Sequence, residues 1–563
     1  MLASLQELAR EASNRIVMLG VVLGFFAIMA VIAARTNTPT PDEFVYVPAG
    51  YYHLTTGDLT FDTTNPPLLK MLMAAPLLAM DVRIDTSPKA RDNSTGWGAW
   101  IFGTSFMELN RERYLDAFFR ARLVIVALGL VLGVLVFARA RELLSPAGAL
   151  AALLVYGTMP PVIAHASVAT LDVGVSLALF AALIAAARFA RSKAVVWALA
   201  TGAAFGFGFA IKGTAALFAP LVPILVAAEW DDWNADGIRR FVIGGASMLA
   251  AAWLAILVSY RFSGFPLPAP LVEGIRFQIA ASSSGEFPAF LFGSWSQKGW
   301  WYYYLVALVL KTPIASLVLF VAGIVAIATG QGRPGDAAGS RRAEAAWILI
   351  PPLFLLYVLS FHYAKDYGIR YLLPAFPFLV LLAGRGADLL LRSGTYARAA
   401  LAVLLVWQTA ACAFAGPHQL AYFNELAGGP DRARTLLLDS NLDWGQDLGR
   451  LAYYLHDRGL RSACIGYFGH VSPKVYDLDF TLPPTTPAPG LCAISANFLA
   501  GYPYAITYAG DRIRGVRPGA WSWFDKLVPI ARIGRSIYVY DVTAEDVARL
   551  GGSHPPAASP PAR

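Results

Sequence analysis

The amino-acid sequence predicts an all-α polytopic membrane protein with a small α/β domain at its C-terminal end. Three observations lead to this fold class. Hydrophobic residues make up 57% of the 563 residues and charged residues only 15%, whereas soluble proteins carry roughly 25% charged residues. The mean hydropathy of +0.53 is correspondingly high, and the apolar residues are gathered in runs long enough to cross a bilayer. Residues after Gly416 are polar enough to fold in water.

About eleven segments have the length and hydropathy of a transmembrane helix, which needs about 20 mostly apolar residues. We expect these helices near residues 16–34, 118–138, 148–165, 168–188, 194–211, 213–229, 240–260, 312–329, 344–361, 371–388 and 399–416. The first run has no convincing cleavage site, so we interpret it as a retained helix and not as a signal peptide.

The positions of arginine and lysine test this helix count. They fall in alternate loops, at Arg10 and Arg15; Arg139 and Arg141; Arg188, Arg191 and Lys193; Arg239 and Arg240; Arg333, Arg341 and Arg342; and Arg385, Arg392 and Arg398. If the helices alternate, all of these residues lie on one side, which the positive-inside rule makes cytoplasmic. The net charge of +8 is then a matter of membrane orientation, and we exclude nucleic acid as a partner.

The predicted orientation places three long segments outside the cytoplasm: residues 35–117, residues 261–311 and everything after Gly416. The run Pro67 to Met80 is too short to span and contains Lys70, so we expect a helix lying at the membrane interface. The predicted location is therefore the inner (plasma) membrane, with a multi-pass chain and an extracytoplasmic C-terminal domain.

The domain organisation follows from the same change in composition. We expect a transmembrane domain over residues 1–416, with interfacial helices in its outer loop 35–117, an extracytoplasmic α/β domain over 417–550 and a disordered tail over 551–563. In the second domain, Leu448 to His456 is amphipathic and Ile537 to Tyr540 is typical of a strand.

The three cysteines are Cys412, Cys464 and Cys492. Their spacing fits neither a metal site nor a redox motif. Cys464 and Cys492 are able to pair if their domain is extracytoplasmic, because disulfides persist in oxidising compartments. The sequence leaves that pairing open.

Polar side chains collect at the predicted outer ends of the helices. They are Asp42, Glu43, Tyr51, His53, Asp58 and Lys70 after the first span, His165 and Asp172 around a short loop, Lys212 between two helices, Lys311 at the opening of the eighth helix, and Arg370. Each has a plainer explanation, since a helix-end lysine reaches headgroups, an aspartate at a helix start is favoured by the dipole and most histidines are simply hydrogen-bonded. Charges at membrane depth are costly, however, and usually pair or serve a function. Their gathering on one face favours an active or binding site.

Two other classes of function compete with an enzyme. A membrane transporter or lipid flippase with an extracytoplasmic domain would place its polar groups near the bilayer midplane, often in inverted repeats, and no convincing repeat is found. A structural envelope protein would leave the membrane-edge lysines and Asp172 unexplained. A nucleotide-driven pump is disfavoured because no P-loop is present.

A set of motifs occurs in the order found in a known family of enzymes. The first outer loop contains Asp42-Glu43, Ala49-Gly50-Tyr51-Tyr52, Gly57-Asp58 and Asn65-Pro66-Pro67-Leu68. Later come His165-Ala166, Leu171-Asp172, Lys212-Gly213-Thr214, Phe292-Gly293, Lys298-Gly299-Trp300-Trp301, Lys311-Thr312-Pro313, Gly368-Ile369-Arg370-Tyr371-Leu372-Leu373-Pro374, Tyr422-Phe423-Asn424-Glu425 and Asp439-Ser440-Asn441-Leu442-Asp443-Trp444-Gly445-Gln446. Over most of its length the chain resembles the protein mannosyltransferase-like glycosyltransferases, which share the C-type (GT-C) membrane fold.

The resemblance implies an inverting transfer of a sugar from a polyprenyl-phosphate donor to an acceptor hydroxyl on the outer side of the membrane. Asp42 would be the catalytic base, with Glu43 beside it. The donor phosphate would be bound by Lys212, Lys311 and Arg370, and substrates would be bound or oriented by Tyr51, His53, Asp58, Lys70, His165 and Asp172. The partners would be the lipid-linked sugar, the surrounding membrane lipids, and a protein, lipid or envelope glycan as acceptor.

The chain departs from one branch of this fold. Aminoarabinose transferases carry Glu-Lys-Pro where this chain has Thr64-Asn65-Pro66, so the metal ligand and phosphate lysine of that branch are not found here. Some members of the wider fold need a divalent metal and others do not. We predict no cofactor for this chain, and the alternative of a divalent metal is left open.

Overall fold

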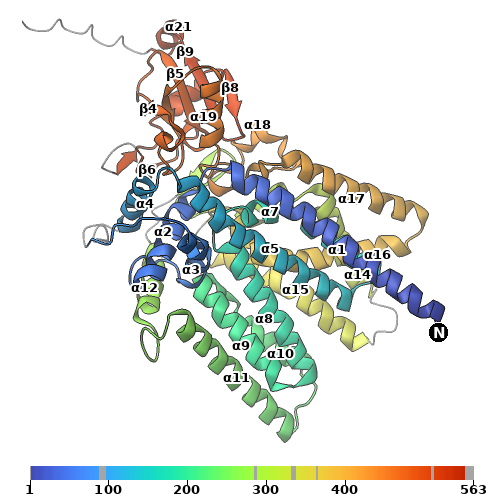
Figure 1. The fold of residues 1–563 in the computed structure, drawn as a ribbon. Coiled ribbons are helices and arrows are strands. Elements are labelled where there is room, and N and C mark those ends of the chain that lie inside the picture. Colours follow the sequence, from blue (N-terminus) through green and yellow to red (C-terminus); the bar gives the residue numbers. More distant parts are fainter. Residues whose placement is uncertain are drawn as a thin grey trace, which may run out of the picture.

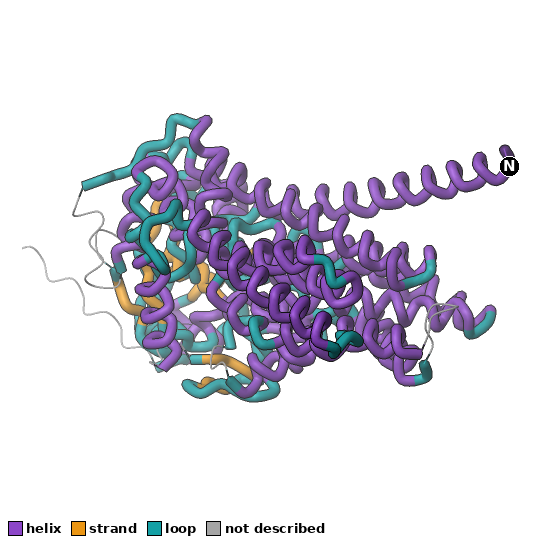
Figure 2. The backbone as a smooth tube through the Cα atoms, turned by 90° about the horizontal axis from the view of Figure 1, so that it is seen from below, coloured by secondary structure: helices purple, strands orange, loops and turns teal. Residues whose placement is uncertain are grey.

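The computed structural model describes residues 2–87, 97–283, 288–330, 338–362, 366–508 and 513–551. The chain is mostly helical, and its largest sheet lies near its C-terminal end (Figure 1). A view turned by 90° shows helices forming almost the whole body and the strands gathered at one end (Figure 2). The predicted fold class, a helical polytopic membrane protein with a small C-terminal α/β region, is confirmed.

Helices occupy every segment that was expected to span the membrane. Within the described residues, seven stretches are long and apolar enough to cross by themselves. They belong to α1 (Leu2–Thr36), α5 (Tyr114–Leu143), α8 (Asp172–Ser192), α11 (Ala235–Ser259), α15 (Ala338–Phe361), η4 (Ile369–Ala375) with α16 (Phe376–Arg392), and α17 (Thr395–Ala415). Two bent pairs raise the number to nine. The other expected spans coincide with the shorter apolar helices α9 (Val195–Ile211), η3 (Gly213–Phe218) and α10 (Leu221–Glu229).

Both bent pairs break at proline. α6 (Pro146–Gly157) and α7 (Pro160–Ala166) meet at 55°, and α13 (Tyr303–Lys311) and α14 (Ile314–Ala328) meet at 115°. Thr312 adopts an extended backbone, because a residue before proline avoids the helical region. The expectation that Lys311 opens the eighth helix is therefore wrong: Lys311 is the last residue of α13, and the helix resumes only after Pro313.

The expected outer loop 35–117 is largely helical. It contains α2 (Pro41–Thr56), α3 (Leu68–Ala74), η1 (Ala75–Ala79) and α4 (Gly98–Leu109). Asp42 and Glu43 lie in the first turn of α2, where negative charge is favoured by the helix dipole. The backbone N–H of Thr40 donates to Glu43 Oε2 at 2.8 Å, which satisfies a donor at the helix start. The short apolar run after Pro67 is helical, and its position at a membrane interface stays a prediction.

The chain after α17 forms a unit, residues 417–551, around a five-stranded sheet. Its strands are ordered β4-β3-β5-β9-β8 and comprise β3 (Ser462–Gly466), β4 (Asp479–Thr481), β5 (Gly490–Ser495), β8 (Ala531–Ile533) and β9 (Ile537–Val542). β3 pairs in parallel with β4 and β5, whereas β9 is antiparallel to β5 and β8. The amphipathic helix α19 (Leu448–Asp457) buries Leu448, Leu451 and Leu455. Both the helix and the strand expected in this region are present.

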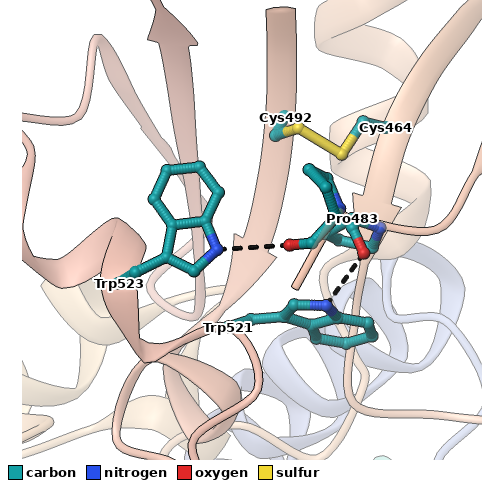
Figure 3. Close-up of a disulfide and its surroundings, with 6 residues drawn as sticks. Cys464, Pro483, Cys492, Trp521 and Trp523 are labelled. Atoms are coloured by element: carbon teal, nitrogen blue, oxygen red, sulfur yellow. Dashed lines mark hydrogen bonds between the residues drawn. A yellow bond between two sulfur atoms is a disulfide. The ribbon is translucent and has the colours of Figure 1, made fainter. Parts of the chain in front are cut away.

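A disulfide joins Cys464 on β3 to Cys492 on β5 (Figure 3). The two residues are directly paired in the register of these parallel strands. The pairing that the sequence left open is therefore present. Nearby, the Trp521 indole donates to the carbonyl of Pro483 at 3.0 Å, so the loop between β4 and β5 is fastened at this edge as well.

The C-terminal unit, drawn in orange to red at the top of Figure 1, rests on the ends of helices far away in the sequence. The N–H of Thr38, just after α1, donates to the carbonyl of Gln446 at 2.9 Å. Arg450 on α19 donates to the side chains of Thr36 and Asn37, each at 2.9 Å. These bonds place the segment 439–450 directly above the start of α2, where Asp42 lies.

Candidate active site

The first feature of the site is an ion pair between Asp42 and Arg370. Asp42 lies in the first turn of α2 and Arg370 in η4. Nη1 of Arg370 donates to Oδ2 of Asp42 at 2.5 Å, and the two side chains are 10% and 23% exposed, respectively. The Tyr46 hydroxyl lies 3.5 Å from the same carboxylate oxygen and accepts from Asn65 Nδ2 at 3.0 Å. Asp42 is thus an ion-paired carboxylate that remains partly exposed to solvent.

The neighbouring Glu43 points into the protein instead. Nε and Nη2 of Arg122 donate to its two carboxylate oxygens at 2.7 and 2.8 Å. The N–H of Ala169 adds a bond of 2.7 Å, beside the one from Thr40. The side chain is fully buried, so Glu43 ties the start of α2 to α5 and to the loop before α8.

A second ion pair joins Lys212 at the end of α9 to Asp172 at the start of α8. Their charged atoms are 2.5 Å apart, and the side chains are 12% and 3% exposed. The ring of Tyr371 lies 4.5 Å from Lys212 Nζ and 5.3 Å from the guanidinium carbon of Arg370. Tyr371 thus contacts both cations through its face, an arrangement that favours positive charge.

A small pocket opens beside these charges. Its polar end is formed by Asp172, Lys212, Thr214 and Arg370. Its wall is apolar apart from the Tyr371 hydroxyl and comprises Val175, Leu179, Leu217, Phe218, Leu355, Leu359, Tyr371 and Pro374. The structure therefore brings Asp172, Lys212 and Arg370 together in the lining of one pocket, and Asp42 is joined to them through its ion pair with Arg370.

Lys311 does not line this pocket. Its ammonium is buried and donates to the carbonyl of Leu420 at 2.9 Å and to that of Asn441, with the Phe423 ring 4.4 Å away. Backbone carbonyls of the C-terminal unit thus surround the charge. This position suits a structural link between α13 and that unit. The role of phosphate ligand expected for Lys311 stays a prediction, and the pocket described above gives it no support.

The candidates at the far end of α2 form a separate cluster. Lys70 is buried in an ion pair of 2.9 Å with Asp62. Nδ1 of His53 lies 2.8 Å from the carbonyl of Asp58, and burial, aided by the charge of Lys70, lowers the pKa of His53 to about 4. His53 is therefore neutral at physiological pH.

Asp58 and Tyr51 complete this cluster through local bonds. Burial acts to raise the pKa of Asp58, but hydrogen bonds from Thr60 and Tyr52 outweigh it and lower that pKa. The Tyr51 hydroxyl donates to the carbonyl of Val82 at 3.3 Å. None of the four candidates Tyr51, His53, Asp58 and Lys70 lines the pocket described above.

His165, by contrast, faces the site from the end of α7. It is 1% exposed, and its ring lies 6.1 Å from that of Trp444. Within the part of the chain that the structure describes, its Nδ1 has no hydrogen-bond partner. The charges of Asp172 and Arg370 both interact with the His165 imidazole.

Three residues near the site were not among the candidates, although Tyr371 and Trp444 lie in motifs that carry the resemblance. Trp444, from the C-terminal unit, lies with its ring 4.5 Å from the guanidinium carbon of Arg370. Tyr371 and Arg122 are described above. The signal for Arg122 was an arginine inside the apolar run 118–138, which also holds Arg120, since an intramembrane charge requires a partner.

A model of a protein family matches part of the chain. Residues 104–258 match the model described as dolichyl-phosphate-mannose-protein mannosyltransferase. The resemblance to the protein mannosyltransferases is confirmed. The matched mannosyltransferase segment contains Asp172 and Lys212, whereas Asp42 and Arg370 lie outside it.

Solved structures add a likeness over the whole length. ArnT from Cupriavidus metallidurans bound to undecaprenyl phosphate is 15% identical, with a TM-score of 0.46 over 94% of this chain and 98% of that chain. The same protein in its apo state is 16% identical, with a TM-score of 0.48 over 97% of this chain and 100% of that chain. No curated protein matches the sequence.

Metal binding was left open by the resemblance. Among the residues that the structure describes, no three or more His, Cys, Asp or Glu side chains are grouped so as to hold a metal ion. The carboxylates nearest the pocket, Asp42 and Asp172, each bind a basic side chain instead.

Proposed function

We propose that this protein is a membrane glycosyltransferase that moves a sugar from a polyprenyl-phosphate donor to a hydroxyl group of an acceptor. The observation that carries the proposal is the ion pair between Asp42 and Arg370. It joins a partly exposed carboxylate, able to act as a base, to an arginine that lines a small pocket and is able to bind a phosphate. The match of residues 104–258 to the mannosyltransferase family supports the same class of reaction.

The pocket suits a lipid-linked phosphate on two counts. Lys212 and Arg370 stand at its polar end, and both side chains bind phosphate oxygens well. The Leu, Val and Phe side chains beside them are suited to contact with the start of an isoprenoid chain, whose transfer from water is favourable. Asp172 fixes Lys212 in place through their ion pair, so we assign it a positioning role.

The reaction follows from this arrangement. The acceptor hydroxyl attacks the anomeric carbon while its proton passes to the carboxylate of Asp42. The bond from that carbon to the phosphate oxygen breaks, and the polyprenyl phosphate leaves with an added negative charge. Arg370 and Lys212 stabilise that charge as it develops. A single displacement of this kind inverts the anomeric centre.

We place the site and the C-terminal unit on the extracytoplasmic side of the inner membrane. The distribution of arginines and lysines supports this orientation. The disulfide between Cys464 and Cys492 supports it independently, since disulfides are rare in a reducing cytosol. The acceptor is then a protein, lipid or glycan of the envelope.

The test uses the purified protein in liposomes with a short-chain polyprenyl-phosphate sugar and an extract of envelope acceptors. Release of polyprenyl phosphate by the wild type, lowered roughly 10²-fold or more by Asp42→Asn, is the expected result. Asp81→Asn is the matched control, because Asp81 is 67% exposed and pairs only with Arg113 among the described residues. Chelation of divalent ions should leave release unchanged.

Other outcomes have definite meanings. Equal release by the wild type and Asp42→Asn would reject Asp42 as the base. Movement of the intact donor between leaflets without release would instead identify a flippase, the alternative class.

A further inference from the structure

The C-terminal unit brings one further carboxylate to the site, that of Asp439. It begins the short turn η7 (Asp439–Asn441). Burial raises the pKa of Asp439, the positive charge of Arg370 lowers it, and the negative charge of Asp42 raises it. The Tyr502 hydroxyl lies 3.4 Å from its Oδ2. Asp439 therefore belongs to the same electrostatic environment as the Asp42–Arg370 pair.

The backbone of Asp439 is held in an unfavourable conformation. Its φ of 56° lies in the left-handed region, which costs energy for a residue with a side chain and gathers at functional sites. The surroundings enforce it: the N–H of Asp439 donates to Asn497 Oδ1 at 3.1 Å, and Asn441 Oδ1 accepts from the N–H of Ile369 at 3.0 Å. The turn is thereby docked against the residue that precedes Arg370.

Asp439 also accepts from the N–H of Ser440. Two other acids of the same segment are likewise hydrogen-bonded and lie deeper. Asp443 accepts from the Ser495 hydroxyl and the N–H of Gly445. Asp447 accepts from Ser536 at 2.8 Å and is paired with Arg450 at 2.6 Å. Asp443 and Asp447 are 1% and 0% exposed, whereas Asp439 is only partly buried. Of these three acids, Asp439 is the most exposed.

Asp439 also lies apart from the donor pocket. Arg370 contacts Tyr371, which lines that pocket, and Trp444, which belongs to the loop that begins with Asp439. Neither Asp439 nor Trp444 lines the pocket. The arginine thus stands between the proposed lipid-phosphate site and a second region supplied by the C-terminal unit.

We propose that Asp439 binds the acceptor and holds its attacking end against Asp42. An ionised carboxylate is a hydrogen-bond acceptor only, so it selects an acceptor that carries a second O–H or N–H beside the attacking hydroxyl, as a sugar diol or a Ser or Thr backbone segment does. The inference rests on the proposed function and extends it, because it assigns the C-terminal unit a direct contact with the substrate.

The test is a partition measurement in the same liposomes. A donor sugar is transferred either to the acceptor extract or to water, and the ratio of the two products does not depend on how much enzyme is folded. Asp439→Asn keeps the size and tolerates the left-handed backbone, so it removes mainly the charge. We expect it to lower the ratio of transfer to hydrolysis about 10-fold or more, the scale of a lost charge-assisted bond, while hydrolysis stays within about 3-fold of wild type.

A second variant and a control separate binding from structure. Asp439→Gly relieves the left-handed backbone, so it should raise the melting temperature while lowering the same ratio. A structural role for Asp439 predicts a lower melting temperature instead. Asp443→Asn is the matched control, and its ratio should equal that of the wild type.

The outcomes that overturn the inference are distinct from those that overturn the function. An unchanged ratio in Asp439→Asn, an equal loss of hydrolysis and transfer, or an equal shift in Asp443→Asn would each reject Asp439 as an acceptor-binding residue while leaving the transferase in place. Absence of any donor turnover by the wild type would reject both.

Discussion

Nη1 of Arg370 donates to Oδ2 of Asp42 at 2.5 Å, so the proposed base and the proposed phosphate ligand form an ion pair with each other. The guanidinium that would hold the donor covers one oxygen of the carboxylate that would take the proton. We expect a phosphate that binds Arg370 to compete with Asp42 for the guanidinium. Asp42 would then lose its ion pair, and become a freer base, once the donor is in place.

This competition predicts an ordered reaction with the donor binding first. Polyprenyl phosphate, the product that retains the charge, should inhibit competitively against the donor and noncompetitively against the acceptor. Initial-rate measurements with both substrates varied provide the check. A random order, with equal acceptor affinity in the presence and absence of donor, would contradict the idea that Arg370 masks Asp42.

Lys212→Met should weaken binding of the donor more than it slows the chemical step. The variant removes one of the cations at the polar end of the pocket and leaves Asp172 without its partner. We expect the KM for the donor to rise about 10-fold or more, in line with the loss of a charged hydrogen bond. Lys70→Met is the control, because Lys70 is paired with Asp62 away from the pocket. It should lower the melting temperature and leave the donor KM near that of the wild type.

The buried pair of Glu43 and Arg122 should affect stability, not catalysis. Removing either partner leaves a charge at a fully buried position, which costs about 3 to 5 kcal/mol. We expect Glu43→Gln and Arg122→Met each to lower the melting temperature in detergent markedly. The double variant should lose less than the sum of the two, because the residues are in contact. Strict additivity would show that the two charges do not depend on each other.

The pH dependence of acceptor use should follow Asp439. Burial raises the pKa of this carboxyl to about 6, although Arg370 opposes the effect and Asp42 adds to it. The group is ionised above that value and protonated below it, and only the ionised form is purely a hydrogen-bond acceptor. The ratio of transfer to hydrolysis should therefore fall in the wild type as the pH drops from 8 to 5. In Asp439→Asn the ratio should stay flat, and a matching slope in that variant would assign the titration to another group.

The disulfide should stabilise the C-terminal unit. Cys464 and Cys492 are 28 residues apart, and closing a loop of that length is worth about 3 to 4 kcal/mol in the chain-entropy model. Cys464→Ala with Cys492→Ala should lower the melting temperature of the unit, as should reduction of the wild type. Replacement of the buried Cys412 controls for the loss of a cysteine as such, and because this variant keeps the disulfide, its melting temperature should fall on reduction as that of the wild type does.

Much of the architecture was predictable because long apolar runs and polar segments leave strong signals. The helices, the break after Gly416, α19 and β9 lie where the hydropathy and periodicity predicted them. The gathering of Asp42, Asp172, Lys212 and Arg370 was predictable too, since all four lie at helix ends expected on one side. The number of membrane crossings is a matter of placement in a bilayer and stays a prediction.

The details of the site were harder to foresee, because they depend on partners that leave no mark in the sequence. Lys311 is bound by backbone carbonyls, and any residue has a carbonyl. Arg122 meets Glu43 across 79 positions, and only a structure shows which acid it chooses. The segment from Asp439 to Trp444 was found as a motif, but its contacts with Arg370 and Ile369 were hidden because they join the C-terminal unit to the helices.

The contacts of Asn441 and Trp444 with the helices also bear on how the protein is made. Lys311 and Arg370 belong to the helical part of the chain, yet Leu420, Asn441 and Trp444, which contact them, are translated only after the last apolar helix. A chain that ends near Gly416 contains all of its apolar helices but lacks the residues of the C-terminal unit that contact Arg370. The candidate site is thus completed only when the C-terminal unit has been synthesised and has docked on the helices.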